Sequence, residues 1–263
     1  MKGRRHADPM KTPLGPTAEY FDGWYADMLD SPVKDEIVRR HLGLPPHLLS
    51  TSLLSWEGTA DIVGALRLRP GDTLLDLACG RGGYGLEVAA RTGARLVGVD
   101  FSAEAVRQAR KQARRLGRVA DFRVGDLAAS GLDPRSVDAV LCVDAIQFAE
   151  QPHDAYRELL RVLAPGGRVV LTCWQPVEPG DARLPDRLRR LDLKEGLTAA
   201  GFDEVEVQDR LDWRASERSL WEEASALEPG DDPALQAFHD EGVRAHELFD
   251  LLRRVMATAT APG

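Results

Sequence analysis

A short apolar segment, residues 74–79, carries one acidic side chain, Asp76, and leads directly into a cluster of glycines. An apolar run of this length followed by glycines predicts a buried parallel strand, a tight turn and then a helix. Gly80, Gly82 and Gly85 would let the backbone approach a ligand closely, and the helix start would offer free N–H groups. The segment therefore predicts a binding site for a nucleotide-like ligand.

Two ligand classes compete for this turn. The spacing Gly80-x-Gly82-x-x-Gly85 matches the dinucleotide fingerprint G-x-G-x-x-G, which is a weak indicator by itself. A second frame, Asp76-x-Ala78-x-Gly80-x-Gly82, places an acid four residues before Gly80. A dinucleotide fold puts its glycines directly at the strand end without that acid, so Asp76 favours the second frame. A glycine turn that binds nothing is the remaining alternative.

Three further acidic residues follow expected strands. Asp100 ends the second apolar segment, Asp126 follows the third and Asp144 follows the fourth. Ligands of parallel, doubly wound sheets bind outside the carboxyl ends of the strands. A carboxylate at Asp100 can accept from both ribose hydroxyls of a nucleoside, and one at Asp126 can accept from the exocyclic amine of adenine. These acids predict an adenosine-containing ligand at that edge of the sheet.

Strands and helices alternate along the chain at the interval of a parallel, doubly wound α/β sheet. Ser102 provides an N-cap for the helix after the second strand, and Pro152 opens the helix after the fourth. Residues 164–167, Ala-Pro-Gly-Gly, are expected to form the turn into the fifth strand, and one helix is expected over residues 187–200. The expected strands are residues 74–79, 96–100, 119–124, 137–143, 168–174 and 202–210.

In this order the segments resemble the class I S-adenosylmethionine (SAM)-dependent methyltransferases over roughly residues 73–174. The matching parts are the glycine turn, the strand-end acids, Val-Asp-Ala-Val-Leu-Cys-Val-Asp at residues 137–144, and Leu-Leu-Arg-Val-Leu-Ala-Pro-Gly-Gly at residues 159–167. Within that family the chain is most similar to bacterial small-molecule methyltransferases of secondary metabolism. The resemblance implies SAM as co-substrate and a Rossmann-like sheet of seven strands, mostly parallel, with an antiparallel last strand at residues 251–260.

The resemblance also implies which residues contact SAM. In that family the residue at Phe101 lies against the adenosine, and the backbone around Cys142 and Val143 meets the methionine amine. Ala78 departs from the family pattern, which has a glycine there, and we expect its backbone to keep a negative φ. The implied SAM-binding residues are Asp76, Ala78, Gly80, Gly82, Asp100, Phe101, Asp126, Leu127, Cys142 and Val143.

Helical segments outside the alternating region are expected to form a cap. Residues 1–16 are basic and rich in Pro and Gly, which predicts a disordered tail. Residues 17–55 are predicted to be an N-terminal helical lid, whose first helix is rich in aromatic residues. The SAM-binding domain is predicted at residues 56–263, with two further cap helices inserted at residues 214–248, between the sixth and seventh strands.

Methyl transfer from a sulfonium donor needs an oriented acceptor and a dry site, and it needs a general base only if the acceptor atom carries a proton. The histidines His153, His239 and His246 are weak candidates for that base, and Gln147 cannot act as one. The sequence therefore identifies no catalytic residue. The predicted substrate-binding residues are Tyr20, Tyr25, Gln147, Trp174 and Trp213.

Composition limits the partners that the chain can bind. Its 263 residues have a formal net charge of −8, which disfavours nucleic acids and anionic membranes. Cys79, Cys142 and Cys173 lack the spacing of a metal site or of a disulfide framework, which predicts no metal and a reducing cytoplasm. We expect no membrane span and no signal peptide. The chain is therefore expected to be a cytoplasmic monomer or homodimer with a small-molecule acceptor.

The sequence as a whole predicts a SAM-dependent methyltransferase that acts on a small, hydrophobic, natural-product-like molecule. Two alternatives remain open. A SAM-binding cyclase or accessory protein would keep the same motifs without transferring methyl groups. An NAD(P)-dependent oxidoreductase is favoured only by the G-x-G-x-x-G spacing, and it leaves Asp126 and the Ala-Pro-Gly-Gly turn unexplained.

Overall fold

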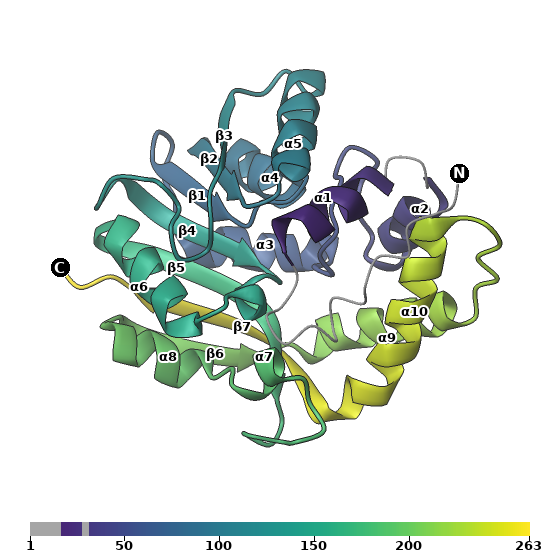
Figure 1. The fold of residues 1–263 in the computed structure, drawn as a ribbon. Coiled ribbons are helices and arrows are strands. Elements are labelled where there is room, and N and C mark those ends of the chain that lie inside the picture. Colours follow the sequence, from purple (N-terminus) through teal and green to yellow (C-terminus); the bar gives the residue numbers. More distant parts are fainter. Residues whose placement is uncertain (1–16, 28–31) are drawn as a thin grey trace.

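Seven strands form the central sheet, in the order β3-β2-β1-β4-β5-β7-β6 (Figure 1). Neighbouring strands among β1 to β5 are parallel, whereas β7 is antiparallel to both β5 and β6. The predicted seven-stranded, mostly parallel sheet with an antiparallel last strand is therefore confirmed. The strands are β1 (Thr73–Leu77), β2 (Arg95–Asp100), β3 (Ala120–Val124), β4 (Val137–Val143), β5 (Leu163–Pro176), β6 (Asp203–Asp209) and β7 (Leu252–Thr260).

The structure is a computed structural model that describes residues 17–27 and 32–263. The predicted tail at residues 1–16 and residues 28–31 of the predicted lid lie outside the described residues. None of the helices in the described ranges is long and apolar enough to cross a membrane.

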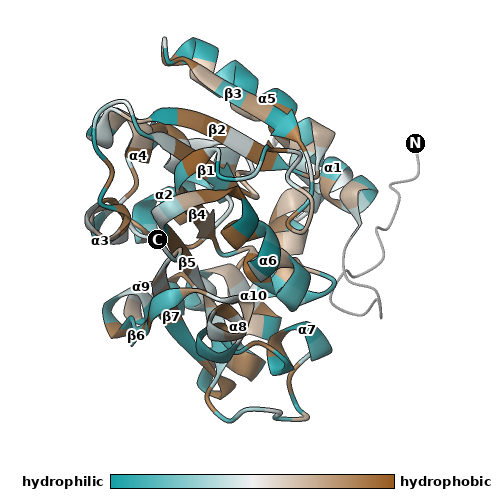
Figure 2. Cartoon of the chain, turned by 90° about the vertical axis from the view of Figure 1, so that its left-hand side faces the viewer, coloured by the Kyte–Doolittle hydropathy of each residue, from teal (hydrophilic) through white to brown (hydrophobic). Residues whose placement is uncertain are grey.

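The sheet is covered by helices on both faces, which is why its central strands are apolar on both sides. Leu74 of β1 packs into one apolar cluster, and Leu75, the next residue, packs into the other. Figure 2 shows hydrophobic segments in the central strands and hydrophilic segments on helices such as α6. One cluster includes α3 (Trp56–Leu66), α4 (Gly83–Thr92) and α5 (Ala103–Arg115), and the other includes α6 (Pro152–Val162) and α8 (Leu193–Ala200).

Four helices form a cap beyond the carboxyl ends of the strands (Figure 1). They are α1 (Ala18–Asp27), α2 (Pro32–His41), α9 (Leu211–Ser225) and α10 (Pro233–Leu248). The last two lie between β6 and β7 in the chain, and they pack on each other and on α2. Helix α1 contacts α10 and also α5. Segments from both ends of the chain thus meet over the same edge of the sheet.

The start of β5 differs from the sequence prediction. The expected turn at residues 164–167 is part of the strand, which begins at Leu163. Its pairing with β4 is irregular there: Val137 pairs with Leu163, and the next paired residue of β5 is Arg168. The Pro-Gly-Gly segment therefore lies inside the strand, at an irregularity in the pairing with β4.

The helix predicted over residues 187–200 is two helices. The first is α7 (Asp186–Arg189), and α8 begins at Leu193. Asp192 separates them, because its backbone is extended and its side chain accepts a hydrogen bond from the N–H of Glu195, 2.9 Å away. A residue in this role marks a new helix start.

Candidate active site

The glycine turn joins β1 to α4 through residues with a positive φ. Ala78, Gly80 and Gly82 have φ values of 60°, 51° and 77°. The expectation that Ala78 keeps a negative φ is wrong. The turn is held by two backbone hydrogen bonds, from the N–H of Cys79 to Val99 O (2.9 Å) and from the N–H of Gly82 to Cys79 O (2.8 Å). A left-handed alanine costs about 1–2 kcal/mol, and these contacts offset that cost.

Asp76 supports the turn from inside the protein. Its Oδ2 accepts a hydrogen bond from the N–H of Gly85, 3.1 Å away, in the first turn of α4. A Cβ at position 85 would collide with this carboxyl, which explains the third glycine of the pattern by packing rather than by a ligand. Asp76 is 3% exposed, and burial, followed by the nearby charge of Asp100, raises its pKa to about 7.

Asp100 ends β2, and its carboxylate can accept hydrogen bonds beyond the two described next. Its Oδ2 accepts from the N–H of Gly80 (2.8 Å), and its Oδ1 accepts from the N–H of Ser102 (2.9 Å). Each carboxylate oxygen has a second lone pair, so two further donors can bind. Burial raises the pKa of Asp100 to about 6, while the two backbone hydrogen bonds lower it. The side chain can therefore accept from two adjacent hydroxyls of a ligand.

A cavity of about 1370 Å³ lies between the carboxyl ends of the strands and the cap. Pockets for a single drug-sized ligand are usually about 300–1,000 Å³, so this cavity has room for two molecules. Asp76 and Gly80 line a separate cavity of about 20 Å³ beside the turn, whereas Gly82 and Cys142 line neither. The predicted SAM-binding residues that line the large cavity are Ala78, Asp100, Phe101, Asp126, Leu127 and Val143.

Helix α1 of the cap docks directly on this side of the cavity. The hydroxyl of Tyr25 lies so close to the glycine turn that a Cβ added at Gly80 would be 2.8 Å from it. Asp22 accepts a hydrogen bond of 2.5 Å from the hydroxyl of Ser102, which is the N-cap residue of α5. The position of α1 is thus fixed by the same residues that surround Asp100.

Helix α2 contacts the turn through charge. Arg81, inside the glycine turn, pairs with both carboxylate oxygens of Asp35 at 2.9 Å. The neighbouring Lys34 is 5% exposed, and burial lowers its pKa. Its ammonium lies over the rings of Trp24 and Phe238, at 4.7 and 5.3 Å from the centroids, which compensates part of its lost hydration. These contacts tie α1, α2 and α10 to one another near the turn.

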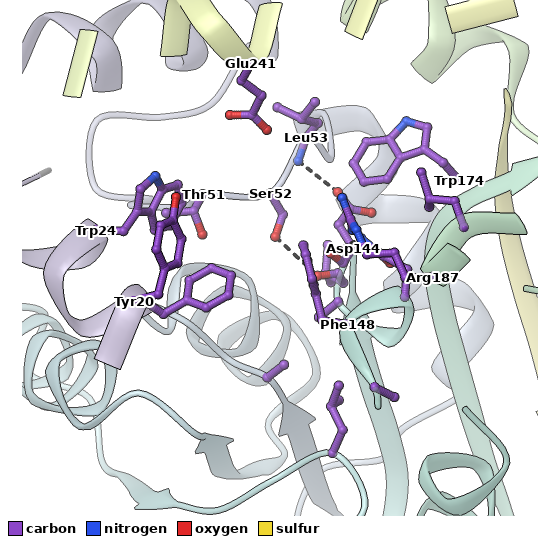
Figure 3. A pocket seen from close by; sticks show the side chains of 18 of the residues that line it. Tyr20, Trp24, Thr51, Ser52, Leu53, Asp144, Phe148, Trp174, Arg187 and Glu241 are labelled. Carbon is purple, nitrogen blue, oxygen red and sulfur yellow. Dashed lines mark hydrogen bonds between the residues drawn. The ribbon is translucent and has the colours of Figure 1, made fainter. Parts of the chain in front are cut away.

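Aromatic side chains line much of the cavity. The ring of Phe21 lies 5.2 Å from that of Phe101 and 5.7 Å from that of Phe148, centroid to centroid. Figure 3 shows Tyr20 and Trp24 on one side of the space and Trp174 on the other. The aromatic residues that line the cavity are Tyr20, Phe21, Trp24, Tyr25, Phe101, Phe148, Trp174, Trp221 and Phe249.

Four of the five predicted substrate-binding residues line the cavity, namely Tyr20, Tyr25, Gln147 and Trp174. Trp213 does not, and its prediction is corrected. It lies in the first turn of α9, is 1% exposed, and packs against Gly58 of α3. Its ring also lies under the guanidinium of Arg210, 4.3 Å away. The helix turns this side chain toward the core rather than toward the ligand space.

The three histidines considered as bases do not line the cavity. His153 and His246 are exposed, and Nδ1 of His239 contacts a carboxylate oxygen of its neighbour Asp240 at 3.1 Å. Within the described ranges, no three His, Cys, Asp or Glu side chains are grouped to hold a metal ion.

A buried ion pair stands behind Trp174 at the inner wall of the cavity. Arg254 of β7 contacts Asp144 through Nη1 and Oδ1 (2.5 Å) and through Nη2 and Oδ2 (2.8 Å). Asp144 also accepts from the N–H of Leu53 (2.9 Å; Figure 3) and from the hydroxyl of Thr172 (2.6 Å). These donors fix the side chain of Asp144, and its charge is balanced by Arg254.

Glu217 of α9 adds a second carboxyl to this pair. Its Oε2 accepts from Nε1 of Trp174 (2.8 Å), and its Oε1 lies 2.6 Å from Nε of Arg254. Burial raises the pKa of Glu217 to about 7, although Arg254 and the Trp174 hydrogen bond lower it. Burial alone would lower the pKa of Arg254, but Asp144 and Glu217 raise it above its ordinary value.

Glu217 and Arg254 were not predicted from the sequence. Glu217 lies on a helix between Trp213, Leu220 and Trp221, which are its neighbours at helical spacing and are all buried. A charged residue on an apolar helix face is a detectable sign of a buried charge. The helix pattern does not reveal which residue pairs with Glu217, because the partner, Arg254, lies on β7.

Residues 75–171 match the methyltransferase domain family. Among curated proteins, the chain is 40% identical over 104 residues to squalene methyltransferase 2 of Botryococcus braunii, an alignment that covers 39% of this chain and 28% of that protein. The chain spans only 28% to 38% of the lengths of the curated relatives that it matches.

Two solved structures match nearly the whole chain. One is the [4+2]-cyclase SpnF, with a TM-score of 0.72 and 25% identity, covering 95% of this chain and 98% of that one. The other is geranyl diphosphate C-methyltransferase from Streptomyces coelicolor A3(2), in complex with S-adenosyl-L-homocysteine. It has a TM-score of 0.65 and 18% identity, covering 97% of this chain and 99% of that one, so this similarity concerns the fold.

Proposed function

We propose that the chain is a class I SAM-dependent methyltransferase that transfers the methyl group of SAM to a small, hydrophobic, natural-product-like molecule, because residues 75–171 match the methyltransferase domain family. The observation that carries the proposal is the cavity of about 1370 Å³, which connects Asp100 and Asp126 to an aromatic compartment around Trp174. The match to the methyltransferase domain family covers residues 75–171, which include the glycine turn, and it argues against the NAD(P)-dependent alternative.

The residues on the strand side of the cavity fit SAM by their chemistry. Asp100 has two lone pairs for ribose hydroxyls. Asp126 is exposed, and among the residues that the structure describes only its Oδ1 accepts a side-chain hydrogen bond, from the N–H of Ala128 at 2.9 Å. Its second oxygen is free for an adenine amine. Phe101 offers an apolar face for the base, and the backbone at Ala78 and Val143 lines the adjoining wall.

Bound SAM would supply a methyl group already activated on a sulfonium, so the protein's task is to orient the acceptor and to exclude water. Phe21 of the cap and Phe148 after β4 both line the cavity, and their rings contact each other. Trp174 and Trp221 offer aromatic surface to an apolar acceptor. Gln147 is held by its Nε2, which donates to the carbonyl of Asp144 at 2.7 Å.

The acceptor class is proposed from the cavity and from the relatives together. The names of two relatives give squalene and geranyl diphosphate as what they act on, and both molecules have isoprenoid chains. An aromatic compartment suits such chains better than it suits a small ion. We therefore propose an acceptor of isoprenoid or similarly apolar character.

Transfer from isotopically labelled SAM tests the proposal. The wild-type protein, given a library of hydrophobic natural products, should yield products heavier by one labelled methyl group in place of a proton. Asp100→Ala should bind SAM about 10-fold more weakly or worse, because two buried hydroxyls lose their acceptor. A wild-type protein that does not bind SAM in calorimetry, or that labels no acceptor, would contradict the proposed function.

Cyclisation without methyl transfer is the second candidate function. It is supported by the similarity to a [4+2]-cyclase over 95% of the chain. The same library experiment separates the two candidates. A cyclase would convert an acceptor to an isomer of equal mass and would leave the label in SAM.

We also propose the division of the chain into a lid at residues 17–55, a SAM-binding domain at residues 56–263 and a cap insertion at residues 214–248. The packing of α1 on α10 and of α2 on α9 supports a cap made jointly by the lid and the insertion. A cytoplasmic location is proposed because the three cysteines are free and buried.

A further inference from the structure

Two buried oxygen atoms at the inner wall of the cavity have no hydrogen-bond donor. They are Oε1 of Gln147 and Oε1 of Glu217: neither accepts a hydrogen bond from the described residues, although Glu217 Oε1 forms an ion pair with Arg254 Nε at 2.6 Å. Both side chains line the cavity, although their exposed fractions are only 3% and 1%. Arg254 Nε is close to Glu217 Oε1 but is not aligned for a hydrogen bond. Unfilled buried acceptors are costly, so a ligand gains affinity by bringing a donor.

Two carboxyls at this wall pair with one guanidinium. Asp144 and Glu217 both contact Arg254. Asp144 contacts both Nη atoms of Arg254 and accepts from two other donors, whereas Glu217 faces only Nε. The second negative charge is therefore held less well at Glu217 than at Asp144. Glu217 is the carboxyl that can take up and release a proton, in agreement with its pKa of about 7.

The groups that act on Glu217 come from few elements. Arg254 of β7 and Asp144 after β4 face it, and Arg214 lies one turn earlier on α9. Helix α2 packs against α9, but its charged side chains Arg40 and His41 contact Glu223 instead. Helix α10 also packs against α9, and there His239 contacts Asp240 on its own helix. Burial is the largest cause that raises the pKa of Glu217 and Asp144 adds to it, whereas Arg254, the Trp174 hydrogen bond and Arg214 lower it.

On the basis of the proposed methyl transfer, we propose that the acceptor carries a hydroxyl on its apolar frame and that Glu217 is the catalytic base that takes the hydroxyl proton. The hydroxyl oxygen forms the bond to the methyl carbon, and the carbon–sulfur bond breaks with its electron pair going to sulfur. The hydroxyl proton goes to Oε1 of Glu217 and leaves to water after product release. Gln147 Oε1 accepts from a second donor on the acceptor. A pure hydrocarbon would leave both oxygens unfilled.

Binding tests this proposal without turnover. The probes are para-pentylphenol and pentylbenzene, which differ only in the hydroxyl. In calorimetry with S-adenosylhomocysteine present, the wild-type protein should bind the phenol at least about 10-fold more tightly. Glu217→Leu should remove most of that difference, and Glu222→Leu, an exposed site on the same helix, should keep it. Equal binding of the two probes by the wild-type protein would overturn the proposal.

Turnover then tests the role of the carboxylate. With a hydroxylated acceptor, Glu217→Gln should lower kcat by about 100-fold or more, with unchanged affinity for SAM and a melting temperature no lower than that of wild type. Wild-type kcat should rise with pH and level off above about 7, and the variant should lack that rise. Glu222→Gln should behave as wild type. A Glu217→Gln variant within about threefold of wild type, with the same pH profile, would refute the base.

The two proposals fail in different ways. If the wild-type protein transfers methyl groups only to carbon, the hydroxyl acceptor is wrong and the methyltransferase function stands. If it transfers none, the methyltransferase function is wrong, and the phenol–benzene comparison still decides whether the wall selects a hydroxyl.

Discussion

Replacing Glu217 with glutamine should change how the stability of the protein depends on pH. In the wild-type protein, burial raises the pKa of this carboxyl from 4.5 to about 7. Between those pH values the folded protein holds a proton at Glu217 that the unfolded chain has lost. The free energy of unfolding therefore falls as pH rises from about 4.5 to about 7, and this loss is complete above the folded-state pKa.

The size of the effect follows from the displacement of the pKa. At about 1.36 kcal/mol for each pH unit, a change from 4.5 to about 7 corresponds to about 3 kcal/mol. Glutamine does not titrate, so the variant lacks this loss. Burial also raises the pKa values of Asp76 and Asp100, but both proteins contain these residues. The difference between the two stability curves therefore isolates Glu217.

Chemical denaturation at a series of pH values measures the effect. Relative to wild type, Glu217→Gln should gain about 3 kcal/mol between about pH 4.5 and about pH 8. Glu222→Gln, at an exposed position of the same helix, should give a curve parallel to that of wild type. If the Glu217→Gln curve is also parallel to that of wild type, the pKa of Glu217 is not raised by burial in the folded protein.

Three further changes test other parts of the structure. Arg254→Met should lower the free energy of unfolding by about 3–5 kcal/mol, because it leaves two buried carboxyls unpaired. In the same denaturation assay Arg253→Met, which removes an exposed ion pair with Asp209, should cost at most about 1 kcal/mol. Asp126→Asn should weaken discrimination between adenosine and inosine forms of S-adenosylhomocysteine in competition binding, and unchanged discrimination would mean that the carboxylate does not contact the base. Asp22→Ala removes a hydrogen bond that fixes α1, so steady-state kinetics should show a higher KM for SAM with little change in kcat.

The sequence by itself determined the sheet and the positions of the acids at its edge. Each apolar segment is a local pattern, and parallel strands bring their carboxyl ends to the same side. Asp100 and Asp126 could therefore be assigned to one cavity without coordinates, and both line it. Ser102 could also be identified as an N-cap from the sequence, because capping is a local interaction. Its side chain accepts a hydrogen bond from the N–H of Ala105, a few residues further along the chain.

Tertiary structure decided which way side chains face and which groups meet. The positive φ of Ala78 is imposed by contacts with β2 that override the local preference of alanine. Trp213 and Glu217 lie one turn apart on α9 and are both buried, yet only Glu217 reaches the cavity. Helical periodicity places both on a buried face but does not say what that face meets. The charge that balances Asp144 belongs to Arg254, 110 residues away, and only the packing of β7 brings the two together.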